Sequence, residues 1–417
     1  MRDRLIGLIK KAPMGPALVR LAKSAVSEPA RARARARLAD RLGGLADWTD
    51  AGVDLLGARP LHITFGPLYD NPYQMLFYGA PRAGYAAEAG GVGDALARLS
   101  APAPAGAIRC YHQHWLNQTV HGEQSAEEAR RSADDLVAQV TAYREAGGLF
   151  AWTLHNLASH EGAHAAVEQE LNRRLAAAAD VVIAHGAFAA EQAVAAFGAA
   201  PERVLATPHG SYIGVYADEI GRAGARAARG LGEDRVCFAF LGFLRRYKGL
   251  EELVSVGSEM ARTEPRMKML IAGAPIGMRA SDLAELAGPE LDLTLIAKSV
   301  PDDEVQGVLR AADWCVLPFR KVLTSGSTIL ALSFGAPVIA PAMGVLPEVV
   351  TDGREGFLYA ADDPDGLREA MRRALETPPE RRAEMAAAAR ARAEALLWAE
   401  GRRALISRLI AAADARG

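Results

Sequence analysis

Short apolar runs alternate with alanine-rich amphipathic stretches from residue 57 onward. In the first half of the chain, the expected strands cover residues 60–65, 107–111, 149–155, 181–185 and 204–208. In the second half, they cover residues 235–244, 267–272, 291–297, 314–318, 337–340 and 356–359. The expected helices cover residues 126–145, 164–178, 250–263, 302–312, 363–375 and 379–413. Strands that alternate with helices are typical of parallel sheets with helices on both faces.

A polar stretch at residues 218–230 separates the two series of strands. A chain of 417 residues also exceeds the size at which one hydrophobic core usually stops growing. We therefore expect an α/β fold with two Rossmann-like domains that face a central cleft. The N-terminal domain would span residues 46–220 and the C-terminal domain residues 221–390, with a basic segment at 1–45 and a closing helix at 391–417.

The overall composition excludes several classes of protein. Lysine and arginine number 48 against 50 acidic residues, a net charge of −2, so no general positive field recruits nucleic acid. The sequence has no run of roughly 18 apolar residues, the length that a membrane-spanning helix needs. The three cysteines, Cys110, Cys237 and Cys315, lie too far apart in sequence to suggest a disulfide framework. This usage indicates a reducing compartment, and we expect a cytoplasmic protein.

Residues 1–45 differ from the rest of the chain in charge. They hold eleven Arg and Lys residues against three acidic residues, a net charge of +8. Apolar residues interleave with these cations in the pattern of one or two amphipathic helices, which can bind an anionic membrane surface. One interpretation is therefore peripheral attachment to the inner face of the cell membrane. The other is a solvated helix without a membrane role.

Ligands of open parallel sheets bind at the carboxyl ends of the strands, so the residues after each strand are candidates for a site. In the second half, Gly242-Phe-Leu-Arg245-Arg-Tyr-Lys248-Gly249 follows an apolar strand. A glycine there allows a ligand to approach the backbone. Arg245 supplies a planar fork of donors and Lys248 a point charge, a pair suited to a diphosphate. The alternative is two solvated loop cations.

A second candidate for anion binding is the sequence Thr-Ser-Gly-Ser-Thr at residues 324–328, directly before an apolar helix. The start of a helix presents free N–H groups and the positive end of the helix dipole. The alternative is an ordinary hydroxyl cap of a helix. The candidate anion-binding residues of the two clusters are Gly242, Arg245, Lys248, Ser325, Gly326, Ser327 and Thr328.

Polar residues also follow the strands of the first half. A histidine where an apolar strand opens into a loop can orient a substrate or move a proton, and a purely structural histidine is the alternative. The candidate catalytic residues are His155, Glu161 and Asp70. The candidate acceptor or cleft residues are Tyr73, His160, His209 and Tyr212.

Motifs for a bound cofactor or metal do not occur in the sequence. The loop after the first strand lacks the Gly-x-Gly-x-x-Gly pattern of dinucleotide-binding folds. The pairs His112 with His114 and His160 with His164 lack the further ligands that a metal site needs. We expect neither a cofactor nor a metal.

The order of several short motifs resembles that of bacterial glycosyltransferases of the GT-B fold, in the family-4-like group. Residues 242–249 resemble the Gly-x-x-Arg-x-x-Lys-Gly donor loop of that family. Further matches in the C-terminal half lie at residues 333–339, 344–350 and 352–357. In the N-terminal half, Thr153-Leu-His155-Asn156 resembles a strand end of the family, and Pro208-His209-Gly210 resembles its hinge. The resemblance covers most of residues 57–400.

This resemblance implies a nucleotide-diphosphate sugar, UDP- or GDP-linked, bound to the C-terminal domain as donor. Arg245 and Lys248 would neutralise the diphosphate without a metal, and residues 325–328 would hold the phosphates. The acceptor would be a lipid-linked or polysaccharide glycan, as in exopolysaccharide biosynthesis.

One feature departs from the family pattern. Retaining members carry a Glu-x7-Glu motif, and Val322 and Leu330 occupy those two positions here. A retaining enzyme would then rely on polar groups such as His155, whereas an inverting enzyme would need Glu161 or Asp70 as a base. Two other hypotheses are a catalytically silent GT-B protein that binds partners in a glycan-assembly complex, and a GT-B nucleotide-sugar epimerase.

Overall fold

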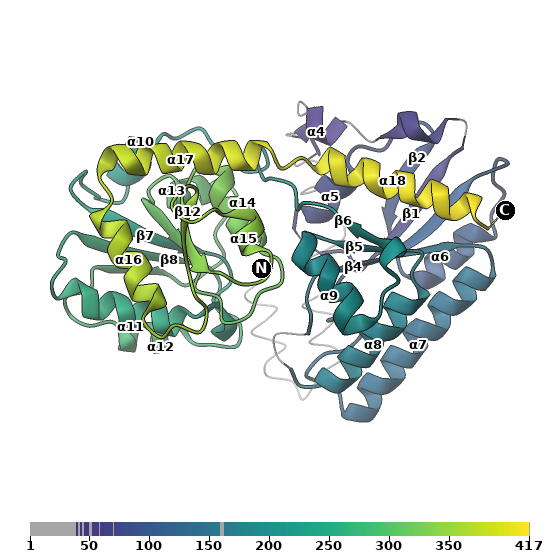
Figure 1. The fold of residues 1–417 in the computed structure, drawn as a ribbon, viewed down its shortest axis with the longest axis horizontal. Helices are drawn as coiled ribbons and strands as arrows, with labels where there is room; N and C mark the ends of the chain where they lie inside the picture. The colour runs from purple at the N-terminus through teal and green to yellow at the C-terminus, as the bar shows by residue number, and fades with distance from the viewer. Residues whose placement is uncertain are drawn as a thin grey trace, which may run out of the picture.

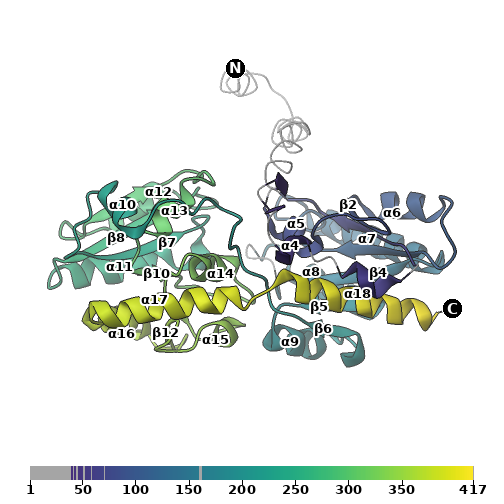
Figure 2. The ribbon, with the colours of Figure 1, turned by 90° about the horizontal axis from the view of Figure 1, so that it is seen from above.

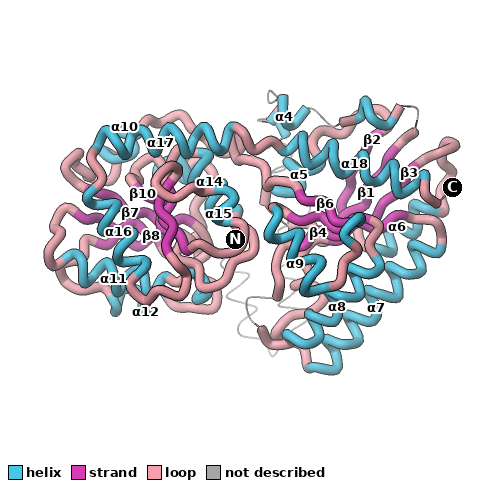
Figure 3. The backbone as a smooth tube through the Cα atoms, in the orientation of Figure 1, coloured by secondary structure: helices cyan, strands magenta, loops and turns pink. Residues whose placement is uncertain are grey.

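The structure, a computed structural model, describes residues 39–416 except for 41, 44–45, 50–51, 58, 70 and 159–161. Most of the basic segment at 1–45 thus lies outside the described residues. The described chain forms two α/β domains side by side, each with a parallel sheet between layers of helices (Figures 1 and 3). No helix in the described part of the chain is long and apolar enough to cross a bilayer.

The N-terminal domain contains a six-stranded parallel sheet in the order β2-β1-β3-β4-β5-β6. Its strands are β1 (Leu61–Gly66), β2 (Tyr85–Ala89), β3 (Ile108–Gln113), β4 (Leu149–Leu154), β5 (Val181–Ala184) and β6 (Val204–Ala206). Its helices are α4 (Ala46–Thr49), η1 (Val53–Leu56), α5 (Tyr73–Tyr78), α6 (Val92–Leu99), α7 (Ala126–Glu145), α8 (Ala165–Ala178), α9 (Ala187–Phe197) and η2 (Pro201–Arg203). The sequence pattern does not predict β2, an alanine-rich edge strand that pairs with β1.

The C-terminal domain contains a second six-stranded parallel sheet in the order β12-β11-β10-β7-β8-β9. Its strands are β7 (Val236–Leu241), β8 (Met267–Ala272), β9 (Leu293–Ile296), β10 (Trp314–Val316), β11 (Val338–Pro341) and β12 (Gly356–Tyr359). Its helices are α10 (Arg222–Ala227), η3 (Arg246–Lys248), α11 (Leu250–Ala261), α12 (Ala280–Leu286), α13 (Val305–Leu309), α14 (Gly326–Ser333), α15 (Leu346–Val349), α16 (Gly366–Glu376) and α17 (Pro379–Glu394). This strand order is that of a Rossmann domain.

Each sheet has one point where the connections from two neighbouring strands leave in opposite directions. This switch point lies between β1 and β3 in the first sheet and between β7 and β10 in the second. Such a point opens a crevice at the carboxyl ends of its strands, where ligands of α/β proteins bind. The loops after these four strands are therefore the place to look for a site.

The closing helix expected at residues 379–413 is two helices, α17 and α18 (Trp398–Asp414). Figure 2 shows that α17 lies along the C-terminal domain and α18 along the N-terminal domain. The buried residues of α17 join the C-terminal core, and those of α18 join the N-terminal core. Because each helix covers a different domain, the chain has to turn between them.

Two segments of the chain cross between the domains at this turn. One contains Ser211, and the other connects α17 to α18. The backbone N–H of Ser211 donates to the carbonyl oxygen of Leu396 at 2.9 Å. The indole N–H of Trp398 donates to the carbonyl oxygen of Ser211 at 2.7 Å. A Cβ atom at Gly210 would lie 2.4 Å from the Trp398 ring, so only glycine allows this close approach. These contacts hold the two crossings together and fix the position of His209.

Candidate functional site

The loop after β7 brings three of the candidate anion-binding residues together. Gly242 has φ of +146°, a backbone conformation that favours glycine. A Cβ atom at this position would lie 2.8 Å from Nζ of Lys248 and 3.4 Å from Oγ of Ser327. The missing side chain therefore leaves space between an ammonium group and the start of α14.

Lys248 is a buried cation. The residue is only 7% exposed, and its ammonium group forms no ion pair with the residues that the structure describes. Its ammonium group faces the rings of Phe240 and Phe319, at 5.4 and 6.0 Å from their centroids. Burial and the charge of Arg245 lower the pKa of Lys248 to about 8. A charge held out of water without a partner is costly, which favours binding of an anion here.

Arg245 and Arg246 show the difference between a site cation and a surface cation. Arg245 is half-buried, and its Nε is buried without a hydrogen-bond partner. Burial raises the pKa of Tyr69 in the N-terminal domain, and a hydrogen bond to Asn117 and the charge of Arg245 oppose that rise. Arg246 is exposed and lies 3.2 Å from a carboxylate oxygen of Glu251. Arg245 is thus available to an anion, whereas Arg246 is already paired.

The four residues at the start of α14 divide into two pairs. Oγ of Ser325 accepts hydrogen bonds from the backbone N–H of Thr328 at 3.1 Å and from its hydroxyl at 2.9 Å. Thr328 is 0% exposed, so these two hydroxyls cap the helix, and both residues also belong to the lining of the pocket between the domains. Gly326 and Ser327 lie in the first turn, where backbone N–H groups lack partners within the helix. All four residues, 325–328, remain candidates for phosphate contact.

Residues of the N-terminal domain and hinge meet this helix start. A Cβ atom at Gly326 would lie 3.0 Å from the hydroxyl of Tyr212 and 3.8 Å from Nε2 of His209. Burial lowers the pKa of His209 to about 4, so its ring is neutral at pH 7. The hydroxyl of Thr324 donates to the carbonyl oxygen of His155 across the domain boundary at 3.4 Å. His155, His209 and Tyr212 therefore border the cleft.

The other candidates of the first half lie elsewhere or are not described. Tyr73 is 3% exposed, and its hydroxyl lies 2.6 Å from Nε2 of His185. It therefore lies behind the cleft surface, where it cannot touch an acceptor directly. Asp70, His160 and Glu161 fall outside the described residues.

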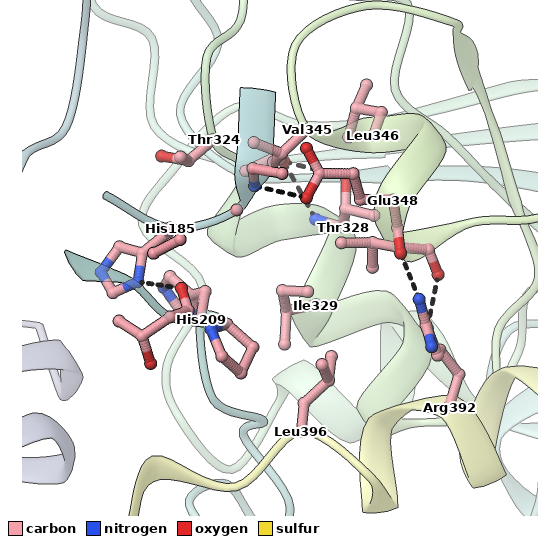
Figure 4. A pocket seen from close by; sticks show the side chains of 17 residues that line it. His185, His209, Thr324, Thr328, Ile329, Val345, Leu346, Glu348, Arg392 and Leu396 are labelled. Carbon is pink, nitrogen blue, oxygen red and sulfur yellow. Dashed lines mark hydrogen bonds between the residues drawn. The ribbon is translucent and has the colours of Figure 1, made fainter. Parts of the chain in front are cut away.

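A pocket of about 340 Å³ lies between the domains (Figure 4). One of its lining residues is Glu348, which belongs to the motif at residues 344–350 and for which the sequence predicts no contact. Glu348 of α15 accepts hydrogen bonds from the backbone N–H groups of Ala187 and Phe188, each at 2.7 Å. Those two groups begin α9 of the other domain, where the helix dipole favours a carboxylate. Arg392 of α17 donates to the backbone carbonyls of Glu348 and Val349. Glu348 thus ties the two domains together.

We expect Glu348→Gln to weaken this contact by about 1–2 kcal/mol, because it removes the charge that the start of α9 stabilises. Small-angle X-ray scattering should show a larger radius of gyration as more molecules open. Glu128→Gln is the matched control, since Glu128 accepts from Ser125 at the start of α7 within a single domain. An unchanged scattering profile for Glu348→Gln would show that the contact does not hold the domains closed.

No group of three or more potential metal ligands occurs among the residues that the structure describes. His112 and His114, considered above only as a metal pair, instead belong to a buried cluster of histidines and tyrosines. Sequence spacing could not reveal this cluster, because its tyrosines come from helix α5 and its histidines from separate strands or the loops after them.

Comparison with solved structures identifies the fold. Sucrose-phosphate synthase from Thermosynechococcus elongatus superposes with a TM-score of 0.59 and 19% identity, over 86% of this chain and 100% of that one. HepE from Anabaena, solved with UDP and glucose, superposes with a TM-score of 0.56 and 16% identity, over 83% of this chain and 98% of that one. The fold is therefore GT-B, and the expected architecture of two Rossmann-like domains is confirmed.

Sequence comparison matches part of the chain to a known family. Residues 235–377 match the family model described as "Glycosyl transferases group 1". The chain is 29% identical over 279 residues to D-inositol 3-phosphate glycosyltransferase of Geodermatophilus obscurus, over 63% of this chain and 61% of that protein. It is 30% identical over 244 residues to D-inositol 3-phosphate glycosyltransferase 1 of Catenulispora acidiphila, over 56% of this chain and 57% of that protein. These matches span about three fifths of the relatives' length. The chain therefore has the GT-B fold, and its C-terminal domain is similar to the family described as "Glycosyl transferases group 1".

Proposed function

We propose that this protein transfers a sugar from a UDP- or GDP-linked donor to a glycan acceptor. The observation that carries the proposal is the buried ammonium group of Lys248 beside Arg245, at the switch point of the C-terminal sheet, which has no ion-pair partner among the described residues. The start of α14 adds N–H groups at the same place, and Gly242 leaves room for the ligand. This arrangement suits a nucleoside diphosphate.

The same geometry explains how the reaction would be accelerated. As the sugar departs, negative charge grows on the diphosphate leaving group. Fixed cations in a cleft shielded from water stabilise that charge without reorganising. Arg245 and Lys248 supply this charge, and His155 is the proposed polar group beside the anomeric carbon. Glu161 and Asp70 remain our candidates for a base if the reaction inverts configuration.

For the acceptor, we propose a lipid-linked or polysaccharide glycan. The basic segment at residues 1–45 supports this proposal, because it would hold the enzyme near a membrane-bound acceptor. The curated relatives are named for D-inositol 3-phosphate, which makes a small phosphorylated acceptor the competing class. Release of UDP or GDP from a panel of sugar donors, first alone and then with each acceptor class, tests donor and acceptor in turn. The proposal fails if no donor is consumed under any of these conditions.

We expect transfer to continue without a divalent metal, since two protein cations occupy the place where a metal would neutralise the diphosphate. Turnover should be the same with EDTA as with added Mg²⁺ or Mn²⁺. Activity that EDTA abolishes and Mg²⁺ or Mn²⁺ restores would overturn this assignment of the two cations.

We also expect the basic segment to bind anionic membranes reversibly. Each Lys or Arg near such a surface contributes about 1 kcal/mol, and salt screens the attraction. Full-length protein should therefore sediment with vesicles containing phosphatidylserine at low salt and much less at high salt, whereas a variant without residues 1–45 should stay in solution. Equal sedimentation of the two proteins would remove the membrane role.

A second candidate function is that of a silent GT-B protein in a glycan-assembly complex. It is favoured by Val322 and Leu330, which stand where retaining relatives carry glutamates. Both side chains pack against the apolar core of the C-terminal domain. A protein that binds UDP or GDP but consumes no donor with any acceptor class would favour this second function.

A further inference from the structure

A second pocket lies at the edge of the N-terminal sheet that faces away from the cleft. Its lining includes Leu61, Tyr85 and Ile108, the first residues of β1, β2 and β3, whereas the cleft lies at the carboxyl ends of the strands. The two are thus a strand length apart, roughly 17 Å. The pocket has a volume of about 480 Å³, within the roughly 300–1,000 Å³ of small-molecule sites. We refer to it as the arginine pocket, after its basic lining residues His62, Arg82, Arg98 and Arg109.

Strand pairing and one helix bring these side chains together. His62 of β1 pairs in register with Arg109 of β3, so the two side chains lie on the same face of the sheet. Tyr111 lies on that face as well, two residues after Arg109, and it packs in one core cluster with Ala95 of α6. Arg98 follows in the last turn of α6. The arginine pocket therefore lies between the end of α6 and the start of the sheet.

The arginine pocket has an excess of positive charge. Its lining contains three arginines and no carboxylate. Glu88 of β2 lies beside it, where one carboxylate oxygen accepts from Nη2 of Arg98 at 3.1 Å and lies 3.3 Å from Nε2 of His62. Arg82 and Arg109 form no ion pair with the described residues. Three guanidinium groups against one carboxylate leave two positive charges without a counter-charge, which favours an anion.

Two of the arginines also keep a donor without an acceptor. Nη2 of Arg98 donates to Glu88, and Nη2 of Arg109 donates to the carbonyl oxygens of Ala101 at 2.8 Å and Pro102 at 3.4 Å. Nη1 of each arginine is buried and has no hydrogen-bond partner in the described part of the chain. A donor held out of water without an acceptor is costly, so a small turn of either guanidinium toward the oxygens of a ligand is favourable.

The remaining lining of the arginine pocket is mainly apolar. Pro60, Pro102 and Pro104 come from the segments before β1 and β3, and alanines lie between them. Apolar walls with a few charged groups are typical of sites for small organic molecules. An inorganic ion leaves such walls unused, whereas burial of hydrocarbon against them is favourable.

We propose that the arginine pocket binds a phosphate monoester that carries an apolar body. A phosphate monoester has close to two negative charges at pH 7, which match the excess charge of the pocket. Its oxygens suit the planar forks of Arg98 and Arg109, because guanidinium and phosphate groups form pairs of parallel hydrogen bonds. Its apolar body packs against the prolines. This site is separate from the cleft and does not depend on the proposed function.

Calorimetric titration of hexyl phosphate into the full chain tests the proposal. We expect the wild type to bind hexyl phosphate, and to bind inorganic phosphate and hexanol more weakly, because each of these lacks one of the two features. Arg98→Gln and Arg109→Gln should each weaken binding of hexyl phosphate by about tenfold or more, the effect of losing one charged hydrogen bond. Thermal unfolding checks that both variants fold. Arg98→Gln is the safer of the two, since Arg98 holds no backbone segment in place.

Arg131→Gln is the matched control for these variants. Arg131 is exposed on α7 of the same domain and pairs with Glu127, away from the arginine pocket. It should bind hexyl phosphate as the wild type does. The proposal fails if the wild type binds no hexyl phosphate, or binds it no better than inorganic phosphate. It also fails if Lys248→Met abolishes binding while Arg98→Gln leaves it unchanged, since the anion then lies in the cleft.

Vesicles distinguish a lipid headgroup from a soluble ester as the source of the phosphate. Phosphatidic acid carries a phosphate monoester, whereas phosphatidylserine of similar charge carries a diester. If the ligand is a lipid, Arg98→Gln should sediment less than the wild type with phosphatidic acid vesicles and equally with phosphatidylserine vesicles. If it is a soluble ester, the two proteins should sediment equally with both, although Arg98→Gln still binds hexyl phosphate more weakly. Both results support the arginine pocket and differ only in the source of its ligand.

Discussion

Replacing Lys248 with methionine is expected to slow donor turnover and to stabilise the fold at the same time. Loss of one fixed cation from the leaving group should raise the barrier by about 2–4 kcal/mol, which lowers kcat/KM roughly 30- to 1000-fold. The free energy of unfolding should rise by an amount on the order of 1–3 kcal/mol at pH 7, because the variant no longer buries an unpaired charge. Donor kinetics and thermal unfolding measure the two effects.

The stability gain should depend on pH in a defined direction. The pKa of Lys248 is about 8 in the folded chain, below its ordinary value of 10.5. The charged lysine therefore destabilises the wild type fully below pH 8, and this cost disappears as the pH rises toward 10.5. Arg246→Ala is the control for activity, since Arg246 is exposed in the same turn and pairs with Glu251. Wild-type kcat/KM in Lys248→Met would refute the role of this cation.

Replacing Asp313 with alanine is expected to cost about 3–5 kcal/mol of folding free energy, because it removes the buried carboxylate that pairs with a buried guanidinium. Oδ2 of Asp313 lies 3.0 Å from Nη1 of Arg226, and Arg226 is 1% exposed. The same oxygen accepts from the backbone N–H of Cys237 at the start of β7. Chemical denaturation measures the loss.

Asp54→Ala is the control for that experiment. Asp54 pairs with Arg403 at 2.8 Å, but both side chains are well exposed, at 64% and 37%. Exposed pairs contribute about 0–1 kcal/mol, so this variant should unfold close to wild type. Equal losses for Asp54→Ala and Asp313→Ala would show that burial is not what makes the Asp313 contact strong.

Elements with a strong local signal could be predicted from the sequence. The apolar runs that form β8 and β12 are flanked by turn residues, and their bounds agree with the structure. The edge strand β2 could not be predicted, since its alanines favour no strand and pairing with β1 decides its conformation. The break between α17 and α18 could not be predicted either, because the alanine-rich sequence favours a continuous helix. The helix ends where the chain contacts Ser211, which is distant in sequence.

The residues of the candidate site also differ in whether the sequence alone could predict their contacts. Gly242, Arg245 and Lys248 are close in sequence, so one loop suffices to suggest their joint role. Glu348 and its partner Ala187 are 161 residues apart, and Tyr73 and His185 are 112 apart. Contacts of that separation depend on how two domains or two strands pack, which a single sequence does not reveal.

Titration of UDP and GDP into wild type and Lys248→Met, followed by calorimetry, tests the central claim most directly. We expect at least one of the two nucleotides to bind the wild type, and to bind Lys248→Met at least about tenfold more weakly, a difference of about 1.4 kcal/mol. Uridine or guanosine, which lacks the diphosphate, should not distinguish the two proteins. Binding of the diphosphate with equal affinity to both proteins, or to neither, would contradict the account.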